Sequence, residues 1–216
     1  MLIVCEGRNT EPLYFKTLRS ALRLHQTVEI EVRGDTPHTD PCGLVQDALN
    51  LREQRLKLAK KTSVQRPYDQ VWVVFDTEWP GKHPRIKEAI QQAVSTKLNV
   101  AISKPSFETW HILHVKDTPP GCACAADAVR VLQELDSVLS SYGKNEEQAR
   151  KAAEWSLQEK RLPRALQHGA RQGADKFDET FVQLPIATGT GVHRLVQLLV
   201  DSCADAPARR QLGVER

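Results

Sequence analysis

The chain has 216 residues, of which 40% are hydrophobic, and a formal net charge of +3, so it can form one large packed domain but is not basic over its whole surface. No apolar run approaches the roughly 18 residues of a membrane span, and the first strand pattern begins too early for a signal peptide, which predicts a cytoplasmic protein with no membrane partner. The five cysteines are scattered and odd in number, which favours reduced thiols over disulfides.

The first half of the chain alternates strand and helix patterns. Short apolar runs and one strictly alternating segment predict strands at residues 2–5, 28–32, 70–75 and 100–103. Apolar stripes of helical period predict helices between them at about 10–24, 44–61 and 85–98. The order β-α-β-α-β-α-β predicts an α/β fold with a mostly parallel sheet flanked by helices.

The second half is predicted to be mainly helical. Its helices are expected at about 107–115, 125–142, 146–156, 162–172 and 192–200. The Pro-rich break near residue 118 divides the chain into a core at 1–116 and a helical extension at 117–216. We expect the extension to pack on the core as one compact domain, with a frayed tail after Pro207.

Carboxylates stand where the predicted buried strands end. Glu6 follows the first apolar run, Asp76 and Glu78 follow the third strand, and Glu108 comes shortly after the fourth. Ligands of open parallel sheets bind at the carboxyl ends of the strands, so these acids should converge on an oxygen-rich site for Mg²⁺ or Mn²⁺. The alternative is that they are surface-turn residues, and that Glu108 only favours the dipole of its helix.

A basic stretch lies at the end of the predicted helix at 44–61. Its basic residues, opposed only by Glu53, are Arg52, Arg55, Lys57, Lys60, Lys61 and Arg66. With Leu49, Leu56 and Leu58 packed on the sheet, we expect the outer face of this helix to be strongly positive and to guide a phosphate backbone toward the acids. The alternatives are a solvated helix face and a contact with an acidic partner protein.

Several segments resemble the RloB-like proteins. Residues 3–7 (Ile-Val-Cys-Glu-Gly) and 10–15 (Thr-Glu-Pro-Leu-Tyr-Phe) resemble the start of that family, and residues 103–114 resemble its Ser-Asn-Pro-x-Phe-Glu-x-Trp-x-x-x-His element. Residues 142–144 and the stretch from Pro185 to Val196 fit later landmarks more loosely. Glu-Gly after the first strand, with an acidic pair after a later strand, also resembles the signature of the Toprim catalytic domain.

This resemblance implies a Toprim-like fold and a metal-dependent nuclease of antiviral defence that acts on DNA or RNA, with an ABC-type ATPase as partner. It implies that Glu6, Asp76 and Glu78 hold Mg²⁺ or Mn²⁺, with Glu6 alternatively a general acid or base. Glu108 would be a further ligand or would orient a neighbouring group. Lys144 would stabilise charge that develops on the phosphate.

Two departures from the family pattern bear on activity. The family usually has Asp at the position of Glu78 and Asn at that of Lys104. Glu78 can still bind Mg²⁺, and Lys104 could contact a phosphate. An alternative function is therefore a catalytically degenerate Toprim-like subunit that binds within an ATPase complex. His111 and His114 share a helix face, as ligands of zinc sites do, but no third ligand is evident.

Overall fold

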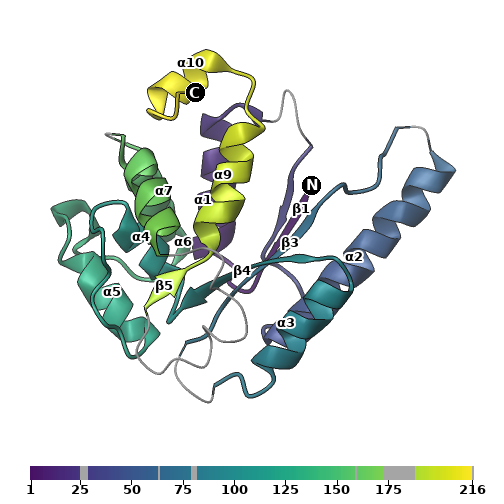
Figure 1. Cartoon of the computed structure of the whole chain (residues 1–216), viewed down its shortest axis with the longest axis horizontal. Helices are drawn as coiled ribbons and strands as arrows, with labels where there is room; N and C mark the ends of the chain where they lie inside the picture. The colour runs from purple at the N-terminus through teal and green to yellow at the C-terminus, as the bar shows by residue number, and fades with distance from the viewer. Residues whose placement is uncertain (25–28, 63, 79–81, 159, 173–187, 216) are drawn as a thin grey trace.

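The computed structural model describes residues 1–24, 29–62, 64–78, 82–158, 160–172 and 188–215. In this part of the chain, five strands form one sheet in the order β2-β1-β3-β4-β5 (Figure 1). The strands are β1 Leu2–Cys5, β2 Glu31–Arg33, β3 Val71–Asp76, β4 Asn99–Lys104 and β5 Gly189–Thr190. The pairs β1–β2, β1–β3 and β3–β4 are parallel, and β4–β5 is antiparallel. The expected α/β fold with a mostly parallel sheet is confirmed.

Helices cover both faces of the sheet (Figure 1). The described helices are α1 Thr10–Ala21, α2 Pro41–Lys61, α3 Ile86–Ser95, α4 Glu108–Leu113, α5 Ala125–Gln133, the 3₁₀ turn η2 Ser137–Leu139, α6 Glu146–Ser156, α7 Arg161–Arg171, α9 Val192–Asp201 and α10 Ala206–Gln211. Because successive strand side chains alternate between faces, Leu2 and Val4 pack with α2 and α3, while Ile3 and Cys5 pack with α1, α4 and α9.

The register of the central strands decides where the acids emerge. β1 and β3 run in parallel with Cys5 opposite Val74, so Glu6 and the end of β3 lie at the same edge of the sheet. β4 joins them with Ser103 opposite Asp76. The short turn after β4 leads directly into α4, and this turn brings the first residue of that helix to the same edge.

The C-terminal half contributes to the same sheet and core. β5 pairs with the end of β4, with Thr190 opposite Ser103. α9 then buries Leu195, Val196 and Leu199 in the core cluster that includes Ile3 of β1. A smaller apolar cluster brings side chains of α5, η2 and α6 together with Ile112 of α4. β5 was not expected, because a strand of two residues shows no alternation that a sequence pattern could reveal.

The chain end differs from expectation. A frayed tail after Pro207 was predicted, and this prediction is wrong, because α10 forms there. Asp205 caps the helix by accepting a hydrogen bond from the backbone N–H of Ala208 at 2.8 Å. Leu212 and Val214 beyond the helix are buried in the main core. An apolar anchor of two residues is too short to show helical periodicity.

Other boundaries differ as well. The helix expected at 125–142 ends at Gln133, because Asp136 starts a separate 3₁₀ turn by accepting a hydrogen bond from the backbone N–H of Val138 at 2.9 Å. Of the strand expected at 28–32, Val28 lies outside the described residues and β2 begins at Glu31. Among the helices that the structure describes, none has the length and apolar character that a membrane crossing needs.

Candidate active site

A cavity of about 470 Å³ opens at the carboxyl ends of β1, β3 and β4. Its lining includes all five residues that the sequence analysis proposed for catalysis: Glu6, Asp76, Glu78, Glu108 and Lys144. The ends of the two central parallel strands, the start of α4 and the loop that precedes α6 therefore bring these side chains together. Five ionisable groups around one small cavity affect each other's protonation, because burial weakens the screening of charges by water.

Glu6 joins the two central strands at the floor of this cavity. Its backbone N–H donates to the carbonyl of Val74 at 2.9 Å, and its Oε2 accepts a hydrogen bond from the backbone N–H of Asp76 at 2.9 Å. Burial raises the pKa of Glu6 to about 7, although the bond from Asp76 opposes this shift; the nearby charges of Glu11 and Glu78 add to the rise. A carboxyl group of this kind can exchange a proton near neutral pH.

We expect Glu6→Gln to flatten the pH dependence of stability in the metal-free protein. The folded-state pKa of about 7 lies above the ordinary value of 4.5, so the folded chain holds a proton that the unfolded chain releases. The contribution of Glu6 to stability is therefore fully present below pH 4.5 and is lost as the pH rises to 7, at up to ~1.4 kcal/mol per pH unit.

Urea unfolding in EDTA across this pH range measures the effect. The wild type should lose more stability with rising pH than Glu6→Gln does, and an exposed control, Glu88→Gln, should follow the wild type. Parallel curves for wild type and Glu6→Gln would show that Glu6 titrates as it does in the unfolded chain.

Asp76 ends β3 and is buried beside the other acids. Only 6% of its surface is exposed, and its Oδ1 has no hydrogen-bond partner among the described residues. Burial raises the pKa of Asp76 well above its usual range, and the charges of Glu11, Glu6 and Glu108 raise it further while Lys144 opposes the rise. A buried oxygen without a partner is costly, which is the situation that a bound cation relieves.

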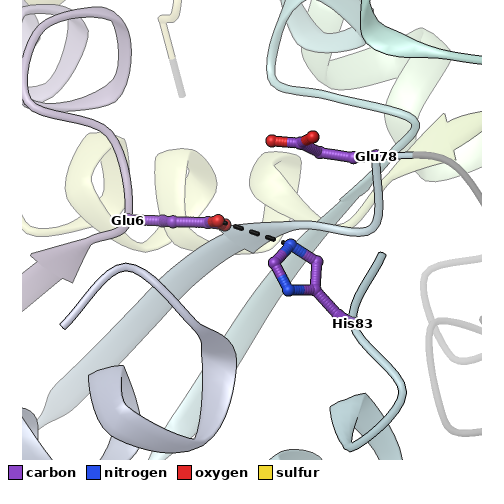
Figure 2. A group of neighbouring side chains, drawn as sticks. All are labelled: Glu6, Glu78 and His83. Carbon is purple, nitrogen blue, oxygen red and sulfur yellow. Dashed lines mark ion pairs between the residues drawn. The ribbon is translucent and has the colours of Figure 1, made fainter. Parts of the chain in front are cut away.

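Glu78 and His83 lie opposite Glu6 (Figure 2), and His83 was not among the residues singled out from the sequence. Glu78 has a left-handed backbone with φ of 54°, donates its N–H to the carbonyl of Pro105 at 2.7 Å, and forms an ion pair with Lys82. Figure 2 shows the side chains of Glu6, Glu78 and His83 converging from separate segments. His83 Nε2 lies 3.5 Å from Glu6 Oε1, and one donor atom from each of the three residues lies within 4.8 Å of the other two.

His83 is well enclosed for a loop residue. Its side chain is 8% exposed, and burial lowers its pKa, with a further decrease from the charge of Lys82. Within the described residues, this group of three is the one whose donor atoms meet closely enough for a shared cation, and Asp76 is not part of it. The proposal that Asp76 is a metal ligand stays a prediction.

Glu108 lies at the start of α4 and is fully buried. Its Oε1 accepts a hydrogen bond from the Tyr142 hydroxyl at 2.8 Å, and its Oε2 accepts one from the Ser106 hydroxyl at 2.5 Å. Lys144 Nζ lies 3.4 Å from the same Oε2. Although burial lowers the pKa of Lys144, the charges of Glu108, Asp76 and Glu11 outweigh it and raise that pKa above its ordinary value. Lys144 is therefore a fixed positive charge at the cavity.

The loop that carries Lys144 is tied to the N-terminal segment. Asn9 donates its side-chain N–H to the Lys144 carbonyl at 2.9 Å, and the Thr10 hydroxyl lies 3.3 Å from the Tyr142 hydroxyl. α6, which follows this loop, packs along α1. Residues more than 130 positions apart thus share one wall of the cavity.

Glu11 is a cavity residue that the site prediction omitted. It is 4% exposed, and its Oε1 accepts a hydrogen bond from the backbone N–H of Gly7 at 3.2 Å. A Cβ on Gly7 would collide with the Glu11 carboxylate, so a side chain at this position would force the carboxylate to move. Burial raises the pKa of Glu11, and Glu108 raises it further. The signal was available, because Glu11 lies within the family-like segment 10–15.

The basic residues proposed for nucleic-acid binding lie apart from the cavity. Lys104, at the end of β4, is outside the lining as the described residues define it, and burial lowers its pKa. Arg55 is only 8% exposed: it pairs with Glu29 at 2.5 Å and its guanidinium carbon lies 5.1 Å from the centre of the Tyr68 ring. The expectation that Arg55 lies on an outer face is therefore wrong.

The remaining basic residues follow α2 away from the cavity. Arg52 donates to the Thr96 carbonyl at 2.8 Å, whereas Lys57 pairs at the surface with Glu53 at 2.7 Å. Leu56 and Leu58 are 41% and 47% exposed, so the prediction that they pack on the sheet is wrong. Asp40 lines the cavity at the start of α2, and the 21 residues of the helix extend about 30 Å beyond it (Figure 1).

His111 and His114 belong to the core rather than to a zinc site. Both are fully buried, and their Nδ1 atoms bond to the Ser156 hydroxyl at 2.7 Å and the Trp110 carbonyl at 2.9 Å. The ring of Tyr14 packs edge-on against both imidazoles. Their separation of three residues places both side chains on the buried face of the short helix α4 and its C-terminal cap.

A comparison with protein-family models places the whole arrangement in one family. The model described as RloB-like protein matches residues 1–199. Pro185, one of the looser landmarks, lies outside the described residues. Searches of curated proteins and of solved structures found no match. Because the family model covers most of the chain, including every residue of the acidic cavity, this protein belongs to the RloB-like family.

Proposed function

We propose that this protein is a divalent-metal-dependent nuclease that cleaves phosphodiester bonds. We further propose that it is an effector of antiviral defence that acts with an ABC-type ATPase. The observation that best supports nuclease chemistry is the convergence of Glu6, Asp76 and Glu78 from neighbouring parallel strands on one cavity that also holds a fixed positive charge, Lys144. Carboxylates that gather at the carboxyl ends of parallel strands are suited to a phosphate-bound Mg²⁺ or Mn²⁺.

The donor chemistry fits such an ion. Glu6 and Glu78 present oxygens to the same space, and the buried Oδ1 of Asp76 lacks a partner nearby. A bound divalent cation would neutralise the phosphoryl oxygens and lower the pKa of a coordinated water. Glu6 would act as one of the ligands of that cation, whose positive charge favours the ionised carboxylate. Lys144 would attract the phosphate and stabilise its added negative charge.

Cleavage assays with the purified chain test this function. Labelled single-stranded and duplex DNA and RNA are incubated with Mg²⁺ or Mn²⁺, and with EDTA as control. We expect cleavage only with the metal. Binding of nucleic acid or of an ATPase without any metal-dependent cleavage would instead support the degenerate-subunit alternative. Co-purification with an ATPase encoded nearby tests the partner separately.

Charge reversal at the end of α2 should affect long substrates only. The 30 Å length of α2 equals about nine base pairs at ~3.4 Å per pair, so a short oligonucleotide in the cavity cannot reach Lys57, Lys60 and Lys61. At physiological salt, charges are screened over about 8 Å, so the charges of these lysines do not act on a short substrate about 30 Å away. We expect the triple Lys→Glu variant to weaken binding of a 20-base-pair duplex and lower its salt slope by up to ~3 units.

A six-nucleotide substrate should bind the triple variant and the wild type equally. Arg150→Glu with Lys151→Glu, on α6, is a control for charge reversal at a surface away from α2, because these residues form exposed ion pairs with Glu146 and Glu147. Unchanged binding of the 20-base-pair duplex across a salt titration would leave this end of α2 without a role in nucleic-acid binding.

A further inference from the structure

The most informative group outside the predicted site is the imidazole of His83. Its side chain is 8% exposed, and its Nε2 faces the acidic cavity without a hydrogen-bond partner at normal distance (Figure 2). The atom in front of it is Glu6 Oε1, at 3.5 Å. At this separation the buried ring nitrogen of His83 is left without a hydrogen bond, while the Glu6 carboxylate is bonded through its other oxygen to the backbone N–H of Asp76.

Glu78 completes a set of three donors. One donor atom each of Glu6, Glu78 and His83 lies within 4.8 Å of the others. Two ligand atoms that each lie about 2.2 Å from the same ion are roughly 3–4.4 Å from one another. Small side-chain rotations would therefore place all three residues on one cation. Glu78 is held nearby by its left-handed backbone and its N–H bond to Pro105. Lys82, which pairs with Glu78, supplies the positive charge that the cation would replace.

We propose that Glu6, Glu78 and His83 form the primary cation site, and that the imidazole makes this site prefer first-row transition ions such as Mn²⁺ over Mg²⁺. Mg²⁺ is bound almost entirely by oxygen ligands and retains several waters, whereas imidazole nitrogen is a good ligand for transition ions. This inference rests on the metal-binding part of the proposed function and not on cleavage. Asp76 remains available as a further oxygen ligand in the same cavity.

Electron paramagnetic resonance of the Mn²⁺-loaded full chain tests the inference directly. Electron spin echo modulation should show coupling to an imidazole ¹⁴N nucleus in the wild type, and His83→Asn should lose it. His38→Asn is a matched control, because His38 is half-exposed, pairs with Asp47 and is not in the group of three. Titration calorimetry should show that His83→Asn weakens Mn²⁺ binding by about tenfold or more and leaves Mg²⁺ binding within about twofold.

Unchanged Mg²⁺ affinity also shows that His83→Asn is folded. Mn²⁺ bound without ¹⁴N coupling, or bound equally by His83→Asn, would overturn the inference while leaving a carboxylate metal site and the proposed function intact. Nitrogen coupling in a chain that cleaves no nucleic acid would support the inference and reject the nuclease. If no divalent ion binds, both proposals fail.

Discussion

Replacing Asp76 by Asn should abolish metal-dependent cleavage while the protein remains folded. Asp76 places a buried carboxylate oxygen without a hydrogen-bond partner at the cavity, and Asn removes its charge with little change in size. Removing a group that only orients a metal ligand lowers metal affinity or activity by ~10–100-fold. Removing Asp76, if it is itself a ligand, should therefore lower the cleavage rate by about a hundredfold or more.

In EDTA, which keeps the protein free of metal, the same substitution should raise thermal stability. The pKa of Asp76 lies well above its usual range because of burial and neighbouring acids, so its ionised form destabilises the folded chain at neutral pH. Asp69→Asn is a matched control, since Asp69 is exposed just before the other end of β3. It should retain wild-type cleavage and stability. Near-normal cleavage by Asp76→Asn would remove Asp76 from the mechanism.

Glu108→Ala should cause the largest loss of stability among single substitutions at the cavity. The side chain is fully buried and accepts bonds from Tyr142, Ser106 and Lys144. Its removal leaves two buried hydroxyls without their acceptor and takes the counter-charge from Lys144. Because Lys144 is 48% exposed, water compensates part of the loss, and we expect ~3 kcal/mol in the free energy of unfolding.

Urea unfolding of Glu108→Ala beside Glu88→Ala measures this effect. Glu88 forms an exposed ion pair with Arg85, so its removal should leave the unfolding midpoint unchanged. Glu108→Gln separates structure from chemistry, because an amide keeps the shape and one acceptor oxygen. A folded Glu108→Gln variant with near-normal cleavage would assign Glu108 a purely structural role. A folded variant that does not cleave would place Glu108 in the chemistry.

The strand-end acids were predictable because a parallel sheet leaves little freedom. Once β1 and β3 are identified as buried parallel strands, Glu6 and Asp76 must emerge at the same edge. Lys144 came only from the resemblance to the family, because nothing in its local pattern indicates a long-range contact with Glu108. His83 and Glu11 reach the cavity through loop geometry and a close approach at Gly7, and neither leaves a periodic signal.

The prediction that Arg55 lies on an outer positive face of α2 was wrong for a related reason. Charge counts along α2 do not reveal that Arg55 is directed toward Glu29 and Tyr68, since both partners come from other segments. Exposed Leu56 and Leu58 likewise show that the end of α2 extends beyond the apolar layer that its first turns contact. Local periodicity predicted the helix but not how far the sheet covers it.

The bonds between Asn9 and the Lys144 backbone, and between Thr10 and Tyr142, bear on how the protein is made. The wall they form cannot close until the ribosome has synthesised the loop at 142–144, and β5 and α9 come later still. An interrupted translation product that ends before this loop would carry Glu108 without two of its partners and without the lysine of the cavity. The acidic cavity therefore gains its full set of partners only after about two thirds of the 216 residues have been synthesised.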